Sequence, residues 1–296
     1  MTLHHRSGLL VALTLLLASP LPAADPVAEL PLEFEKNLPL ATLRVKDTPL
    51  VFVLDSAAAG CVLDGEKAAE MGITATDSAL NSGSGGTIAV GLAHGVRLRL
   101  GGLEVVPDYT VLTPLHGLGF RKAVQGILGF PLFGKYVVEI DYAARQARIF
   151  DPERHQPAPG TEAVPLWMAD GPTVRGRLKL AGAEEIEADF QLDTGSSHVL
   201  TICKAFVDRH RMLERVPGLV LGETVGIGGA SPDRVGRIAS VAVGRFSIDA
   251  PEVRFATGEG GSFESHRFEA NLGNGFLARH LVTFDIPHGR LLLREP

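Results

Sequence analysis

The stretch Phe190-Gln191-Leu192-Asp193-Thr194-Gly195-Ser196-Ser197 decides the fold that this sequence predicts. An apolar strand runs directly into an aspartate, and small hydroxyl residues and a glycine surround the point where the strand ends. A carboxylate at the end of a buried strand is costly unless it is paired or hydrogen-bonded. The neighbouring hydroxyls and free backbone N–H groups are a local supply of such hydrogen bonds. Asp193 is therefore the first candidate for a functional carboxylate.

A second, altered copy of this stretch occurs earlier in the chain, as Phe52-Val53-Leu54-Asp55-Ser56-Ala57-Ala58-Ala59-Gly60. Its aspartate precedes the later one by 193 − 55 = 138 residues. After both aspartates the same elements follow in the same order: a helix-like segment, a Gly-rich loop, an alternating strand pair and closing strands. The offset drifts only to 271 − 127 = 144 residues. Chance likeness would not reproduce a whole ordered series, so the pattern predicts an internal duplication.

The duplication predicts a mainly β fold made of two homologous lobes. Short alternating apolar segments separated by Gly-containing turns indicate strands and hairpins in both halves. We expect an N-terminal lobe over residues 25–150 and a C-terminal lobe over 162–296, joined by a Pro-rich linker over 151–161.

The N-terminal segment has the pattern of an export signal. A short basic region ending at Arg6 precedes the uncharged stretch 8–18, and small residues lead to an exit near Ala24. The apolar stretch is too short to span a bilayer and prolines end it, which disfavours the alternative of a membrane anchor. We expect residues 1–24 to be a signal peptide. The mature protein is then exported, periplasmic or secreted, with no stable membrane span.

The composition is that of a globular protein with ample core, since 45% of the 296 residues are hydrophobic and 21% are charged. The formal net charge is −6 and there is no basic run, so we expect no nucleic-acid partner. Two cysteines, Cys61 and Cys203, follow the two aspartates closely. In an exported protein they could form a disulfide, and buried free thiols are the alternative.

Two homologous lobes that pack like the subunits of a homodimer would bring Asp55 and Asp193 face to face. Two adjacent carboxylates share a proton and titrate as a pair. The ionised member can take a proton from a water held between them, while the protonated member donates to a substrate carbonyl. Ser56 and Thr194 would support the two turns. This chemistry needs no metal and no cofactor, and a duplicated chain can complete the site as a monomer.

At this point the chain resembles the retropepsin-like aspartic proteases, in a single-chain, two-lobe bacterial form similar in plan to pepsin. The resemblance rests on Asp193-Thr194-Gly195 after an apolar strand, and on the elements Ile127-Leu128-Gly129 and Asn271-Leu272-Gly273. It implies two pepsin/retropepsin-like β-barrel lobes with pseudo-two-fold symmetry and a cleft between them. It also implies peptide hydrolysis by a water activated between the catalytic Asp55 and Asp193, with peptide or protein substrates.

The resemblance further implies a flap over the cleft in each half. The Gly-rich segments 83–90 and 225–231 would be mobile covers that close on an extended peptide and exclude water. The candidate flap and substrate-binding residues in these two segments are Gly85, Gly86, Ile88, Gly226, Gly228 and Gly229.

The chain departs from the family pattern at several positions, and one of them, Ala57, keeps a second hypothesis open. Gly195 matches the third motif position, but the first half has Ala57 there, which would be penalised if this residue needed a positive φ. Asn271 also replaces the first apolar residue of its element. The alternative function is therefore a catalytically inactive relative that binds peptides or an envelope partner in the same cleft.

Other constellations do not predict chemistry. The histidines lack the paired helical spacing of zinc sites, so we expect no metal. The segment 226–229 lacks the helix and βαβ setting of a dinucleotide-binding loop. Ser196 and Ser197 have no Gly-x-Ser-x-Gly elbow around them, which disfavours a serine nucleophile.

Overall fold

The structure is a computed structural model that describes residues 25–264 and 267–296. The predicted signal peptide lies outside the described residues. Within the described ranges, no helix is long and apolar enough to cross a membrane. The chain is mainly β, with a few short helices, which confirms the predicted fold class in this respect. The strands pair into three connected sheets, which we call the N-terminal, C-terminal and joining sheets.

The N-terminal sheet is built from the first ten strands, and its hairpins follow the alternation of buried and exposed side chains. Its strands are β1 (Ala28–Glu35), β2 (Leu38–Val45), β3 (Thr48–Leu54), β4 (Cys61–Asp64), β5 (Asp77–Gly83), β6 (Gly86–Ala93), β7 (Leu98–Leu100), β8 (Leu103–Val105), β9 (Thr110–Thr113) and β10 (Gly126–Leu128). All three residues of β10 are buried, because this strand lies between β3 and β4.

The C-terminal sheet contains nine strands from the second half of the chain. They are β14 (Pro172–Lys179), β15 (Glu185–Leu192), β16 (Leu200–Ile202), β17 (Val220–Gly226), β18 (Gly229–Arg237), β19 (Ser240–Val243), β20 (Phe246–Asp249), β21 (Glu252–Ala256) and β22 (Ala270–Leu272). The strand β22 has the same place here as β10 has in the N-terminal sheet, since it lies between β15 and β16.

The joining sheet combines strands from both ends of the chain. It contains β11 (Val137–Asp141), β12 (Gln146–Phe150), β13 (Glu162–Met168), β23 (Leu281–Asp285) and β24 (Arg290–Arg294). Its antiparallel order is β1–β12–β11–β23–β24–β13, so β11 and β23 connect the two halves of the chain. Beside this contact the rings of Phe133 and Phe284 pack edge to face, with centroids 5.3 Å apart.

The helices are short and lie between strands. They are α1 (Gly65–Glu70), α2 (Phe130–Phe133), α3 (Lys204–Arg209), α4 (Met212–Arg215) and α5 (Asn274–Leu277), with 3₁₀ turns η1 (His116–Leu118), η2 (Ser262–Glu264) and η3 (Ile286–His288). The helix-like segment expected after Asp193 is divided into α3 and α4, because Arg211 takes a left-handed φ of 50° between them.

The N-terminal and C-terminal sheets repeat one scheme of strand pairing. In the first, β10 pairs parallel with β3 and antiparallel with β4, and β4 pairs parallel with β9. In the second, β22 pairs parallel with β15 and antiparallel with β16, and β16 pairs parallel with β21. Because strand order, direction and register agree, each residue of one scheme has a counterpart in the other.

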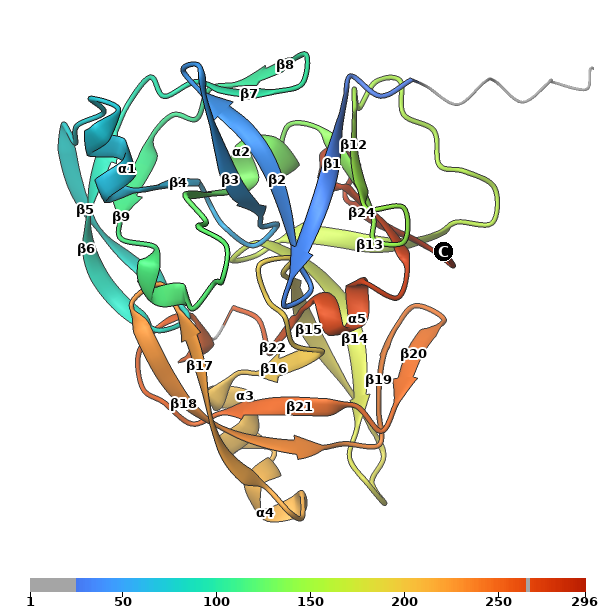
Figure 1. Cartoon of the computed structure of the whole chain (residues 1–296). Helices are drawn as coiled ribbons and strands as arrows, with labels where there is room; N and C mark the ends of the chain where they lie inside the picture. The colour runs from blue at the N-terminus through green and yellow to red at the C-terminus, as the bar shows by residue number, and fades with distance from the viewer. Residues whose placement is uncertain (1–24, 265–266) are drawn as a thin grey trace, which may run out of the picture.

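The arrangement brings the turns of both aspartates to the contact between the N-terminal and C-terminal sheets. Figure 1 shows the N-terminal sheet in blue to green and the C-terminal sheet in yellow to orange, with β3 and β15 directed toward the region between them. The hairpins β5–β6 and β17–β18 extend toward each other on one side of this region (Figure 1). A large cluster of buried apolar side chains continues through all three sheets.

Candidate active site

Each candidate aspartate occupies the first position after a central strand. Asp55 follows β3, and its backbone N–H donates to Leu128 O at 3.0 Å. Asp193 follows β15, and its backbone N–H donates to Leu272 O at 2.9 Å. The paired strands β10 and β22 therefore hold the two aspartates in equivalent positions at the ends of their strands.

The hydroxyls next to the aspartates bind each other's turns. Ser56 N–H donates to Thr194 Oγ1 at 2.9 Å, and Thr194 N–H donates to Ser56 Oγ at 3.0 Å. Each hydroxyl also donates across the contact: Ser56 Oγ to Leu192 O at 2.9 Å and Thr194 Oγ1 to Leu54 O at 2.7 Å. Ser56 and Thr194 are both buried. We call these four reciprocal hydrogen bonds the hydroxyl clamp.

The clamp brings the two carboxyl groups within hydrogen-bonding reach of each other. Asp55 Oδ1 accepts the N–H groups of Ala57 at 2.9 Å and Ala58 at 3.0 Å. Asp193 Oδ1 accepts the N–H of Gly195 at 2.7 Å. Each carboxyl is thus held by its own turn, and the remaining oxygens can face one another.

The electrostatics of the two carboxyls are those of an interacting pair. Burial raises the pKa of the Asp55 carboxyl well above its ordinary value, and the nearby charge of Asp193 raises it further. Burial also raises the pKa of the Asp193 carboxyl, while hydrogen bonds from the Asn271 amide and the Gly195 N–H lower it. The site therefore favours one proton shared between two carboxyls.

The third motif position of the second half requires glycine for a steric reason. A Cβ at Gly195 would lie 2.4 Å from Asp55 Oδ2, so only glycine fits against that carboxyl. Neither Ala57 nor Gly195 is among the described residues that have a positive φ. The penalty considered for alanine at a left-handed position therefore does not arise at Ala57.

Asn271 contacts the site directly, although the sequence singled it out only as a departure. Its Nδ2 donates to Asp193 Oδ2 at 2.7 Å and to Gln191 Oε1 at 3.1 Å. Its counterpart in the N-terminal sheet is Ile127, because both pair with the strand that precedes the aspartate. The available signal in the sequence was that β22 contains an amide side chain, whereas its counterpart β10 contains no polar side chain.

A second asparagine supports the Asp193 turn and was missed. Asn274 Nδ2 donates to the carbonyl oxygens of Thr194 at 2.7 Å and Ser196 at 2.9 Å. Tyr142, which follows β11, donates its hydroxyl to Asn274 Oδ1 at 2.5 Å. A residue of the first half thus fixes the orientation of an amide that holds the second turn. Nothing local in the sequence connects these residues.

The Gly-rich segments form the tips of two hairpins that touch each other. The β5–β6 hairpin turns at 83–86 and the β17–β18 hairpin turns at 226–229. Gly85 N–H donates to Ile227 O at 3.0 Å, and a Cβ on Gly85 would lie 2.1 Å from Gly229 O. Glycine is therefore required at this contact by the close approach of two backbones.

The predicted flap residues lie in these hairpins. Gly85 and Gly86 belong to the first tip, and Gly226, Gly228 and Gly229 belong to the second. Ile88 lies on β6 and packs against the apolar cluster of the N-terminal sheet. The structure thus places these residues on two hairpins whose tips contact each other.

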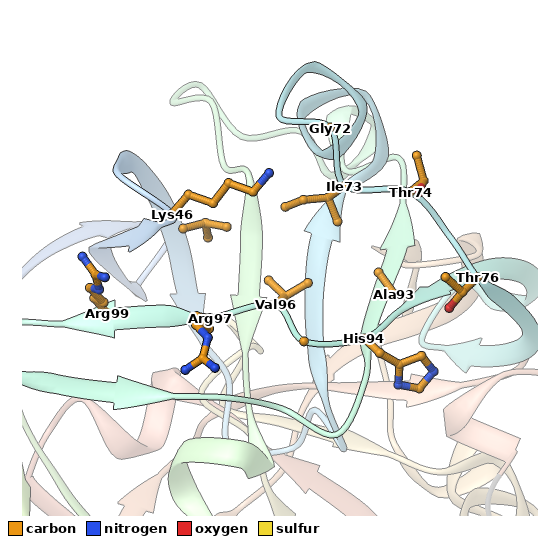
Figure 2. A pocket seen from close by; sticks show the side chains of 12 residues that line it. Lys46, Gly72, Ile73, Thr74, Thr76, Ala93, His94, Val96, Arg97 and Arg99 are labelled. Atoms are coloured by element: carbon orange, nitrogen blue, oxygen red, sulfur yellow. The ribbon is translucent and has the colours of Figure 1, made fainter.

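A separate hollow lies on the outer side of the N-terminal sheet. It has a volume of about 500 Å³, and Figure 2 shows an apolar floor that includes Ile73 and Val96 beside a basic rim. Lys46 Nζ already donates to Met71 O at 2.6 Å. No predicted site residue lines this hollow, and we assign it no part in the chemistry of the aspartates.

The two cysteines are buried free thiols. Burial raises the pKa of the Cys61 thiol to about 12 and raises that of Cys203 further. Neither thiol is reactive in this state, because the thiolate is the nucleophilic form. The structure thus has the buried-thiol alternative and not the disulfide.

Comparisons with known proteins agree with this geometry. Residues 41–132 match a protein-family model described as aspartyl protease, a range that includes the Asp55 turn and β10. A comparison with curated proteins gives no match. Among solved structures, the fold is similar to the crystal structure of basic 7S globulin from soybean, with a TM-score of 0.52 and 12% identity over 92% of this chain and 95% of that chain. The sequence match supports the resemblance to aspartic proteases over residues 41–132, and the structural match shows a shared fold.

Proposed function

We propose that this protein is an aspartic endopeptidase that hydrolyses peptide bonds with a water activated between Asp55 and Asp193. The hydroxyl clamp is the observation that carries this proposal. Four buried hydrogen bonds join two turns that each carry a carboxylate. The match of residues 41–132 to aspartyl proteases supports the same reading.

The reaction follows from the chemistry of a carboxyl pair with one proton. The ionised carboxylate takes a proton from the bound water while the water oxygen attacks the peptide carbonyl carbon. The protonated carboxyl gives its proton to the carbonyl oxygen, so a neutral tetrahedral diol forms. When this diol collapses, the C–N bond breaks and the protonated carboxyl gives its proton to the leaving nitrogen. The other carboxylate takes a proton from a diol hydroxyl, which restores the pair with one proton. No covalent intermediate with the protein is formed.

The two hairpins would hold the substrate. An extended peptide that passes between the aspartates and the hairpin tips could pair with strand edges on either side, which is a common mode of peptide recognition. The tips must separate to admit the peptide, since Gly85 and Ile227 are hydrogen-bonded in this structure. Closure behind the substrate would exclude bulk water from the carboxyl pair.

The remaining proposals concern organisation and location. The repeated pairing scheme supports two lobes related by duplication, over 25–150 and 162–296, with the linker 151–161 between them. The sequence pattern of residues 1–24 supports export to the periplasm or outside the cell. Since one chain supplies both aspartates, we propose that the enzyme acts as a monomer.

The test is peptide hydrolysis by the purified protein. The wild-type chain, Asp55→Asn and Asp193→Asn are incubated with an unstructured protein from acidic to neutral pH, and the new termini are identified by mass spectrometry. We expect cleavage by the wild type and a loss of about 10²–10⁴-fold in each variant, because each removes one member of the acid–base pair.

The same experiment distinguishes the proposed peptidase from an inactive peptide-binding relative. Equal product formation by the wild type and both variants would assign the cleavage to a contaminant and contradict the proposal. Peptides that bind to the wild type without being cut at any pH would instead support an inactive peptide-binding relative.

A further inference from the structure

A short chain of amides leads from a backbone carbonyl to Asp193. Gln191 Nε2 donates to the carbonyl oxygen of Asp170. Gln191 Oε1 accepts from Asn271 Nδ2, which also donates to Asp193 Oδ2. Both side chains are buried, with exposed fractions of 7% for Gln191 and 2% for Asn271. We call Gln191 and Asn271 the amide relay.

The backbone carbonyl fixes the direction of every hydrogen bond in the relay. A carbonyl oxygen can only accept, so the NH₂ group of Gln191 must face Asp170. Its oxygen then faces Asn271, which must present its own NH₂ group toward Gln191. The second hydrogen of that NH₂ group is directed at Asp193 Oδ2. Asp193 Oδ2 is therefore required to be an acceptor.

The two carboxyls consequently have different hydrogen-bonding surroundings. Both oxygens of Asp193 face N–H donors, Oδ1 that of Gly195 and Oδ2 that of Asn271. A proton on either oxygen of Asp193 would therefore face the hydrogen of an N–H donor. Asp55 has two N–H donors on Oδ1, from Ala57 and Ala58, and none from the described residues on Oδ2. Only Asp55 thus has an oxygen on which the shared proton meets no opposing donor.

The N-terminal sheet has no counterpart of the relay. Val53 and Ile127 occupy the positions of Gln191 and Asn271, since each couple pairs in the same parallel register. Both Val53 and Ile127 are buried apolar side chains. The difference between the carboxyls is therefore built into the sequences of the two sheets.

We propose that the amide relay makes Asp193 the ionised member of the pair and Asp55 the member that carries the proton, with Asn271 as the positioning residue. This inference rests on the proposed function for its catalytic meaning. Asp193 would then take the proton from the attacking water, and Asp55 would protonate the peptide carbonyl.

The other charged groups nearby are paired among themselves. Arg254 on β21 binds Asp233 on β18 with an N–O distance of 2.7 Å, and its Nε donates to His198 Nδ1 at 3.3 Å. Burial and the charge of Arg254 lower the pKa of His198 to about 4, so this imidazole is neutral through most of the acidic range. Asp55 is the titratable group that faces Asp193. The pKa values of both carboxyls are raised, chiefly by burial, but the hydrogen bond from Asn271 lowers the pKa of Asp193, and the hydrogen bond between the carboxyls lowers the pKa of Asp193 and raises that of Asp55.

The test is a titration of the two carboxyls in the full chain by NMR, with ¹³C-labelled aspartate carboxyls assigned through Asp55→Asn and Asp193→Asn. We expect Asp193 to ionise at lower pH than Asp55 in the wild type. In Asn271→Ile, which installs the residue of the N-terminal sheet, the midpoint of Asp193 should rise by about one to two pH units, because a hydrogen bond to the charged form is lost. Thr201→Val, which removes a hydroxyl from the cross-strand neighbour, should leave the midpoint unchanged.

Asn271→Ile alone leaves the buried amide oxygen of Gln191 without its donor, which could impair folding. The double variant Gln191→Val/Asn271→Ile removes both amides and serves as the second test if the single variant does not fold. Earlier ionisation of Asp55 in the wild type, or an unchanged Asp193 midpoint in either relay variant, would overturn the inference. Because the titration needs no turnover, it decides this inference even for a protein without peptidase activity. Absence of hydrolysis would refute the proposed function alone.

Discussion

Two sheets with the same strand pairing carry opposite chemistry on the face that adjoins the aspartates. On the N-terminal sheet this face is an apolar cluster, formed by Leu40, Val53, Val62, Val90, Val111 and Ile127. The residues at the matching register positions of the C-terminal sheet are Thr173, Gln191, Thr201, Asp233, Arg254 and Asn271. We call these the apolar face and the polar face.

The contrast shows which residues hold the fold and which adapt the site. The polar side chains do not prevent strand pairing, because the opposite face of the same strands remains apolar. On that face Phe190 and Leu192 are fully buried, as are Phe52 and Leu54. The backbone frame is thus specified by one face of each sheet. The side chains of the other face can differ between the two sheets without changing the strand pairing, and the amide relay is one such difference.

The largest expected effect separates the two third motif positions. Gly195→Ala should reduce peptide hydrolysis by about 10²-fold or more, because the new methyl group would displace the Asp55 carboxyl by the order of an ångström. The matched exchange in the other half, Ala57→Gly, should leave the rate within a few-fold of the wild type. Steady-state kinetics on one peptide substrate compares them, and equal losses would contradict the steric asymmetry.

The hydroxyl clamp should dominate stability near the site. Thr194→Val keeps the shape but leaves Ser56 N–H and Leu54 O without partners, so we expect a loss of about 2–4 kcal/mol in the free energy of unfolding. Thr201→Val makes the same change at a buried hydroxyl with no hydrogen-bond partner among the described residues. It should change stability by less than about 1 kcal/mol. Urea denaturation measures both, and a similar loss in the two variants would contradict the role of the clamp.

The ion pair of the polar face can be replaced by the residues that occupy the matching positions of the apolar face. Arg254→Val alone leaves Asp233 buried without its cation and should cost about 1–3 kcal/mol of stability. Asp233→Val/Arg254→Val gives both positions the residue of the apolar face and should recover most of that loss, since no charge remains buried. Thermal denaturation of the single and double variants tests this. A double variant less stable than the single one would show that the polar face is needed for folding.

A smaller effect should appear in the pH dependence of stability. The folded-state pKa of Asp55 is raised, so its contribution to stability is fully present below the unfolded value of 3.8 and is lost as pH rises through the folded value. Asp55→Asn removes this cost. The variant should therefore be more stable than the wild type at neutral pH, with the difference disappearing below about pH 4. Denaturation at several pH values checks the sign, and a less stable variant at neutral pH would contradict it.

The sequence was sufficient to predict the mainly β fold and to locate the carboxyl pair of the candidate site. Asp55, Asp193 and their hydroxyl neighbours could be found because each turn is a local pattern that occurs twice. The mainly β fold followed from short alternating segments, and the structure confirms it. The two lobes, their boundaries and the catalytic roles remain proposals.

The residues that could not be assigned from the sequence act across long separations. Tyr142 binds Asn274 from 132 residues away, and Asn271 binds Asp193 from 78 residues away. A polar residue in a buried strand reads as an irregularity until its partner is known. The contact between the hairpin tips was likewise hidden, because a Gly-rich segment reads as flexible even when a neighbouring backbone is what requires the glycines.

The pH profile of peptide hydrolysis is the most direct measure of the claim that Asp55 and Asp193 act as one pair with one proton. We predict a bell-shaped dependence of kcat/KM on pH. The rate should fall on the acidic side as Asp193 becomes protonated, and on the alkaline side, well above pH 4, as Asp55 loses the shared proton. A profile with a single titration near pH 4, or activity that stays constant from acidic to alkaline pH, would contradict it.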